Sequence, residues 1–249
     1  MRPVVKLNPG TYTLPDGTLL CVQSHYDNYR DAKPALVYNL GCFCSYCEES
    51  YHQKRDLDVE HIQPKNYKEY GIKIYAHLET EWSNFLLSCT TCNGPDNKDT
   101  KNVILGECHL PHLNNTFKSL VYKDGGVVEV NPMLTGVAAL HAANLLQLVG
   151  LDKSPATSRP GDTRYRKRKE DWNMANRYKE KYNAGKADVG IIVDMVNNRG
   201  GWSIWYTVFK GYDEVRKALL EFPGTAKLCF DAANHYEPID RNPGSPDPT

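Results

Sequence analysis

The sequence predicts an α+β protein in which a metal-stapled unit lies between an N-terminal arm and a mostly helical C-terminal region. Two Cys-x-x-Cys pairs, at 44–47 and 89–92, bracket a short stretch at 57–60 in which apolar and polar residues alternate as in a strand. Helix-forming segments follow at 135–149 and 164–183. These observations divide the chain into an arm at 1–40, the metal-bound unit at 41–130, the helical region at 131–242 and a disordered tail at 243–249.

Proline and glycine punctuate the arm, which predicts extended chain with a short hairpin. Residues 26–40 have loosely helical spacing and end at Gly41, a plausible C-cap; Pro34 fits only if it opens that helix. Pro64 stops the strand at 57–60, and residues 65–82 read as a loop or short helix.

Ser88 is a reasonable N-cap for a short helix through Asn93. Strand signals flank an Asp-Gly-Gly turn near residue 125. Helices are expected at 135–149, closed by Gly150, and at 164–183. A further helix is expected at 213–222, and three aromatic residues are expected in the core: Trp202, Trp205 and Tyr206.

The paired cysteines predict a structural zinc site. Cys44, Cys47, Cys89 and Cys92 can present four thiolates to one tetrahedral ion, and four protein ligands leave no open position for catalysis. Paired Cys-x-x-Cys spacing favours metal over disulfides in a reducing compartment. We interpret the remaining cysteines as small buried hydrophobic residues, with Cys42 as a competing ligand; they are Cys21, Cys42, Cys108 and Cys229.

Glu60 and His61 lie between the cysteine pairs. A histidine with a pKa near neutrality suits general-base chemistry, and a carboxylate with an amide oxygen suits a hard cation such as Mg²⁺. Adjacent strand residues point to opposite faces, which separates a metal ligand from a base unless the strand bends. On its own a Glu-His pair is a common surface feature. Its position between the cysteine pairs favours a functional role over that interpretation.

Together these residues resemble the HNH nucleases that carry a zinc knuckle. The resemblance rests on Cys-x-x-Cys, on Glu-His-Ile-x-Pro, and on Trp-x-Asn-x-x-x-x-Cys-x-x-Cys-Asn. It implies a zinc-bound ββα-metal fold and metal-dependent hydrolysis of DNA. The implied roles are general base for His61, orientation of the base for Asn84, and ligands of the catalytic ion for Glu60 and Asn93.

Asn93 stands where the commonest pattern has histidine, so the chain is similar to the HNN variant. Asparagine oxygen favours Mg²⁺ or Mn²⁺ over softer ions at the catalytic position. The run Gly-Pro-Asp-Asn-Lys that follows is irregular, and Asp96 or Asn97 is an alternative for this role.

A narrower likeness rests on Cys-Ser-Tyr-Cys-Glu-Glu, on Val-Glu-His-Ile-Gln-Pro-Lys and on Asn-Phe-Leu-Leu-Ser-Cys. Over residues 40–130 the chain is similar to prokaryotic HNH subunits that pair with an ABC-type ATPase in Septu and retron anti-phage systems. That likeness implies an effector nuclease of a defence complex, with DNA and an ATPase subunit as partners.

Basic residues near and beyond this unit are candidates for nucleic-acid contact: Lys65, Lys98, Arg164, Arg166, Lys167 and Arg168. For the run at 164–169, a solvated helix face is the alternative. His109-x-x-His112 has ligand-like spacing, but Pro111 argues against a helix there, so we interpret these histidines as surface or packing residues.

Composition narrows the function further. The chain has 249 residues, 30 basic and 30 acidic, so any nucleic-acid contact has to be local. With no apolar run of membrane-spanning length and no signal peptide, we expect a cytoplasmic protein without membrane contact. The competing class is a binding module in which the zinc knuckle holds nucleic acid or protein without catalysis.

Overall fold

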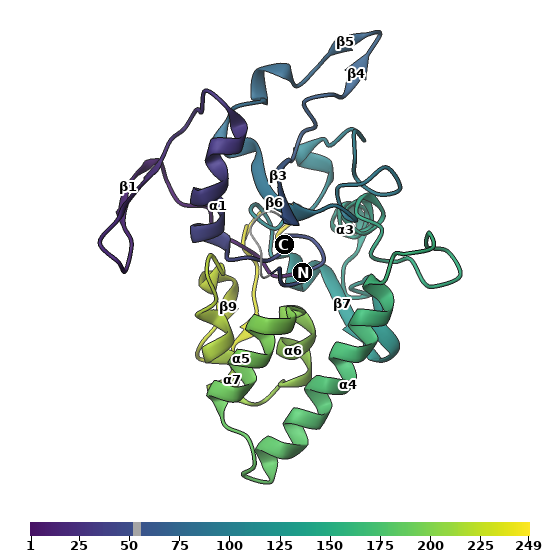
Figure 1. The fold of residues 1–249 in the computed structure, drawn as a ribbon. Helices are drawn as coiled ribbons and strands as arrows, with labels where there is room; N and C mark the ends of the chain where they lie inside the picture. Colours follow the sequence, from purple (N-terminus) through teal and green to yellow (C-terminus); the bar gives the residue numbers. More distant parts are fainter. Residues whose placement is uncertain (52–55) are drawn as a thin grey trace.

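The computed structural model describes residues 1–51 and 56–249. Figure 1 shows two hairpins that project from the body, β1 with β2 and β4 with β5, while the long helix α4 and the short helices α5 to α7 gather at the end opposite β4 and β5. The elements up to the second cysteine pair are β1 (Gly10–Thr13), β2 (Leu19–Val22), η1 (Tyr29–Ala32), α1 (Lys33–Leu40), β3 (Leu57–His61), β4 (Lys68–Glu69), β5 (Ile72–Lys73), η3 (Ala76–Leu78), η4 (Trp82–Asn84) and β6 (Phe85–Cys89).

The elements after it are helical for the most part. They are η5 (Leu105–Glu107), α2 (Thr116–Ser119), β7 (Leu120–Lys123), η6 (Asp124–Gly126), β8 (Val127–Val130), α3 (Gly136–Leu148), α4 (Arg164–Asn183), α5 (Val189–Arg199), α6 (Trp202–Val208), α7 (Asp213–Leu220), η7 (Lys227–Cys229), β9 (Phe230–Asp231) and β10 (Glu237–Pro238).

The strand pair β3 and β6 is the centre of the N-terminal half. The two strands are antiparallel, with Val59 opposite Leu87 and His61 opposite Phe85. All five residues of β6 are buried, and α1 packs against this strand. A strand covered on both sides is nearly continuous in hydrophobic residues, as Phe85-Leu86-Leu87 is. This burial fixes the register, and with it the direction of each β3 side chain.

Several predicted elements are present. Helix α3 begins after Thr135 and ends at Leu148, and α4 has the expected bounds. Pro34 stands in the first turn of α1, where its missing N–H costs nothing. Trp202, Trp205 and Tyr206 are in the core as expected, on helix α6. Within α6 the rings of Trp202 and Tyr206 stack with centroids 4.5 Å apart.

The predicted short helix at the second cysteine pair is wrong. Ser88 and Cys89 end strand β6, and residues 90–100 form turns. A single helical hydrogen bond, from the Asn93 N–H to the Cys89 carbonyl at 3.0 Å, is formed before the chain reaches Gly94-Pro95. Pro95 disfavours the continuation of a helix at this point. The chain is also tightly packed there, because a Cβ on Gly94 would lie 2.7 Å from the Thr90 carbonyl oxygen.

Both ends of the chain differ from the expectation. Met1 and Val4 are buried in the shared core, although residues 1–40 were expected to form an arm. The segment at 243–249 was expected to be disordered, yet Thr249 is buried and the Asp247 carboxylate lies 2.7 Å and 2.8 Å from ring nitrogens of two histidines. These contacts join segments more than a hundred residues apart, which local composition does not encode.

Candidate metal centre and catalytic cleft

The four predicted cysteines converge on one point. The Sγ atoms of Cys44, Cys47, Cys89 and Cys92 all lie within 4.8 Å of one another, and those of Cys47 and Cys89 are 3.8 Å apart. A tetrahedral ion with Zn–S bonds of about 2.3 Å separates its sulfur ligands by about 3.8 Å. The donor set therefore fits a structural zinc ion, and Cys42 is not one of its members.

The knuckle is joined to the helical region through Arg164. Its guanidinium nitrogen Nη1 donates to Cys92 Sγ at 3.2 Å and to the Val149 carbonyl at 2.7 Å. The nitrogen Nη2 donates to the carboxylate of Asp162 at 2.7 Å. Four thiolates around one divalent ion leave a net negative charge, and a buried arginine offsets part of it. Arg164 is therefore a part of the metal centre rather than a contact for DNA, which corrects the expectation.

A cleft of about 440 Å³ opens beside this centre, over strand β3. It is lined by Glu60 and His61 from the strand and by Asn93 from the turn after the second cysteine pair. The structure therefore brings three of the four residues with implied catalytic roles to one place.

His61 is held with a defined tautomer. Its ring is buried against Tyr29 and Phe85, with centroids 4.8 Å and 5.3 Å away, and Nε2 lies 2.9 Å from the Glu79 carbonyl oxygen. A carbonyl only accepts, so Nε2 carries the hydrogen and Nδ1 keeps its lone pair. Burial lowers the pKa of His61, which keeps the ring neutral near pH 7. A neutral imidazole with a lone pair on Nδ1 is ready to accept a proton.

Asn84, the fourth implied residue, contacts the loop that carries Glu79. Its side-chain oxygen accepts from the Gln63 N–H at 2.8 Å, and its Nδ2 donates to the carbonyls of Gln63 and Leu78 at 3.0 Å and 3.2 Å. Leu78 directly precedes Glu79. Asn84 therefore ties the end of β3 to the loop whose carbonyl orients His61.

Glu60 is engaged in a buried ion pair. Its Oε1 lies 2.5 Å from Lys98 Nζ and 3.3 Å from the Tyr46 hydroxyl, and Lys98 also donates to the His61 carbonyl at 2.7 Å. Burial raises the pKa of Glu60, and the ammonium of Lys98 opposes that rise. A cation at Glu60 therefore has to share this carboxylate with Lys98, or displace it.

Two further carboxylates line the cleft and were missed from the sequence: Asp58 and Asp99. Both are exposed. The sequence pattern could have predicted the position of Asp58, because it stands two residues before Glu60 on the same strand and such residues share a face. No sequence pattern predicted the position of Asp99, since that position depends on the irregular turn.

The alternatives Asp96 and Asn97 lie elsewhere. Asp96 is ion-paired with Arg159, and Asn97 donates to the Thr91 carbonyl at 2.8 Å and accepts from Lys153 at 2.9 Å. Neither residue lines the cleft. Asn97 is a buried element of the turn.

The basic residues that we expected to contact nucleic acid fall into two groups, those that are buried and those that are at least partly exposed. Lys98 is fully buried on Glu60, and Arg168 is buried with its guanidinium on the carbonyls of Gly126 and Leu151. Neither is free to reach DNA, so both expectations are corrected. Arg166 is exposed, and Lys167 is half-buried with Nζ on the Arg199 carbonyl at 2.8 Å.

Lys65 lines the cleft, with Nζ 2.8 Å from Glu79 Oε1 and 3.8 Å from the centre of the Tyr29 ring. Two more cations line it that the sequence did not single out, Arg30 on η1 and Lys33 at the start of α1. Their spacing of three residues places them on one side of a helical segment, which was the available signal.

A comparison with protein families finds a match in the N-terminal half of the chain. Residues 44–99 match the family model described as HNH endonuclease, a family of phosphodiester hydrolases. The matched range begins at the first cysteine of the knuckle and ends at Asp99 in the cleft. No curated protein matches the chain. Within the parts of the chain that the structure describes, no helix is long and apolar enough to cross a membrane.

Proposed function

We propose that this chain, which carries an HNH endonuclease domain at residues 44–99, is a metal-dependent endonuclease that hydrolyses DNA phosphodiester bonds. The observation that carries the proposal is the state of His61, whose Nε2–H is bound to a carbonyl, whose Nδ1 keeps its lone pair, and which lines one cleft together with Glu60 and Asn93. That arrangement supports general-base activation of water.

In the proposed mechanism, His61 Nδ1 takes the proton of the attacking water. The Nε2–H stays on the Glu79 carbonyl during this transfer, so the ring does not turn. The Glu79 carboxylate favours the charged imidazole and raises the pKa of His61, against the larger effect of burial. Asn84 maintains this geometry by fixing the loop at Leu78.

Glu60 and Asn93 are the proposed ligands of the catalytic ion, as in the HNN variant, and oxygen donors suit Mg²⁺ or Mn²⁺. When bound, such an ion supplies positive charge to the phosphate and to the departing 3′ oxygen. The carboxylate of Asp58 on the same strand is a further oxygen donor at this cleft.

Arg30, Lys33 and Lys65 are the proposed contacts for the phosphate backbone. All three line the cleft, and Arg30 and Lys65 both lie over the Tyr29 ring, 5.5 Å and 3.8 Å from its centre. Local positive charge of this kind is what a chain of zero net charge needs to hold DNA.

The proposed context is a prokaryotic anti-phage system in the cytoplasm, with an ABC-type ATPase as partner. Its support is the sequence likeness over residues 40–130, together with a thiolate metal centre that suits a reducing compartment.

The test is plasmid cleavage by His61→Ala with Mg²⁺ and with EDTA. We expect the wild-type protein to cut with Mg²⁺ and not with EDTA. His61→Ala should lose cleavage by a factor of at least about 10², the usual contribution of a general base, while its zinc content is retained. His235→Ala is the matched control, because His235 is an exposed histidine that pairs with Asp213 on α7. Unchanged cleavage by His61→Ala would contradict the assigned base.

A further inference from the structure

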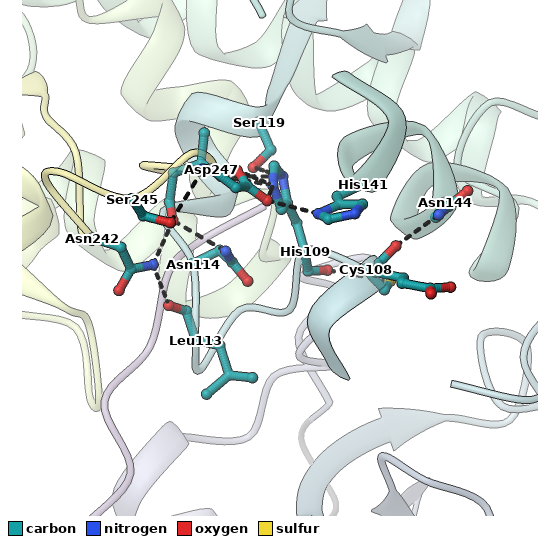
Figure 2. A network of polar contacts seen from close by, with 12 residues as sticks. Cys108, His109, Leu113, Asn114, Ser119, His141, Asn144, Asn242, Ser245 and Asp247 are labelled. Carbon is teal, nitrogen blue, oxygen red and sulfur yellow. Dashed lines mark hydrogen bonds and ion pairs between the residues drawn. The ribbon is translucent and has the colours of Figure 1, made fainter. Parts of the chain in front are cut away.

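A second cluster of metal-ligating side chains lies away from the cleft. It consists of His109, His141 on α3 and Asp247 in the last segment of the chain. Figure 2 shows the two imidazole rings turned toward the Asp247 carboxylate. The sequence spacing suggested His112 as the partner of His109, whereas in the structure the partner is His141.

Three donor atoms converge at this point. Nε2 of His109 lies 2.8 Å and 2.7 Å from the two carboxylate oxygens of Asp247, and Nδ1 of His141 lies 2.8 Å from Oδ2. The side chains are 1%, 12% and 16% exposed in the order His109, His141, Asp247. Two imidazoles and one carboxylate, shielded from water, form a ligand set that divalent transition-metal ions prefer.

The surroundings of His109 match those of a metal-bound histidine. Ser119 Oγ lies 2.8 Å from His109 Nδ1 and 3.3 Å from the Asn115 carbonyl, which can only accept. When Ser119 donates to that carbonyl, Nδ1–H of His109 donates to Ser119, and Nε2 keeps a lone pair that faces Asp247. Histidines that bind metal commonly donate their other N–H to such a neighbour.

We propose that His109, His141 and Asp247 bind a second divalent transition-metal ion, with zinc as the expected occupant, and that this site fastens the C-terminal segment to α3. A cation between Nε2 and the carboxylate replaces the repulsion of two lone-pair donors with two coordinate bonds. Nothing in this site faces the catalytic cleft, so it is structural and independent of the proposed nuclease activity.

The fourth position has a candidate of its own. The Thr249 hydroxyl lies 2.8 Å from His109 Nε2 and 2.9 Å from Asp247 Oδ1. Tetrahedral zinc ligands at about 2.0–2.1 Å are about 3.3 Å apart, so binding needs these short separations between donors to lengthen by about half an ångström. Asp247 lies in a segment without regular secondary structure, where such a shift is easily taken up.

Zinc content of the full chain, purified without a histidine tag, tests the site. Native mass spectrometry of the wild-type protein, after addition of zinc and desalting, should find two ions per chain, one for the cysteines and one for this cluster. His141→Gln and Asp247→Asn should each retain one ion. His235→Gln, which removes a histidine from the exposed pair with Asp213, should retain two.

Cobalt gives a second readout that separates the two sites. The thiolate centre should produce strong near-ultraviolet charge-transfer absorption that is unchanged in His141→Gln and Asp247→Asn. The wild-type protein should bind one further equivalent of cobalt that adds no thiolate absorption, and the two variants should not bind this equivalent. A wild-type protein that binds a single ion, or variants that keep both ions, would overturn the proposal and leave a hydrogen-bonded His–Asp–His cluster. Neither result bears on plasmid cleavage, so the failure of one proposal is distinguishable from that of the other.

Discussion

At the scale of single residues, the chemistry that we propose for the cleft depends on which nitrogen of His61 carries the hydrogen. The Glu79 carbonyl decides this, and the tautomer is held by a backbone atom that no side-chain substitution removes. The pKa of His61 then decides when the base is available. Burial lowers it, the Glu79 carbonyl opposes the shift, and the ammonium of Lys65 lowers it further.

A pH dependence follows with a definite sign. His61 accepts a proton only when it is neutral, so single-turnover cleavage should rise with pH and level off once the pH exceeds its lowered pKa, below the usual value of about 6.5. Lys65→Met removes a cation and frees the Glu79 carboxylate, and both changes should move the inflection to higher pH. Rates at saturating DNA and Mg²⁺ check this. An inflection that moves to lower pH in Lys65→Met would contradict the assignment.

At the scale of elements, strand β3 and the segment η1–α1 both line the cleft. The strand supplies the predicted base and a carboxylate, and the helical segment supplies Arg30 and Lys33. Helix α4, whose basic run suggested a DNA contact, instead turns Arg164 and Arg168 into the core.

The two basic segments can be compared directly. In a His61→Ala background, which binds without cutting, Arg30→Ala and Lys33→Ala should weaken DNA binding and each reduce the slope of log Kd against log salt by about one. Arg166→Ala is the matched control, since it removes an exposed arginine from α4. The reverse pattern would place the DNA on α4 and contradict the proposed path.

The sequence predicts an element well when residues close together in the chain determine it, and poorly when distant residues do. Periodicity and caps predicted α3 and α4, and the cysteine spacing predicted the metal centre, because each is encoded within a few residues. The turn at 90–100 was mispredicted because Gly94-Pro95 overrides the helical preference before it. The burial of Lys98 was missed because its partner, Glu60, lies 38 residues earlier in the chain.

At the scale of the whole molecule, the zinc centre joins both halves. Two of its ligands follow α1, one is the last residue of β6 and one follows that strand, and Arg164 on α4 donates to one of the sulfurs. Structural zinc binding contributes about 10–16 kcal/mol in apparent terms, which is comparable with the whole stability of a domain. The fold of the N-terminal half should therefore depend on the ion.

Cys47→Ser tests this dependence. We expect the variant to lose the ion and to become insoluble or unfolded, measured by zinc content and circular dichroism. Cys21→Ser is the matched control, because Cys21, which we expected from the sequence to be buried, is exposed and outside the cluster. This variant should behave as the wild-type protein. A wild-type protein that stays folded and soluble after zinc is removed would contradict a structural role.

The ion pair between Lys98 and Glu60 has a consequence for the resting protein. Lys98 neutralises the buried carboxylate in advance, so the fold does not depend on the catalytic ion as it depends on zinc. Any cation that binds at Glu60 competes with an ammonium already in place, which weakens its affinity for the empty cleft. A phosphate that enters the cleft adds negative charge and favours the second cation. Under the proposed function, DNA and metal would thus bind cooperatively, and the protein would stay idle in magnesium alone.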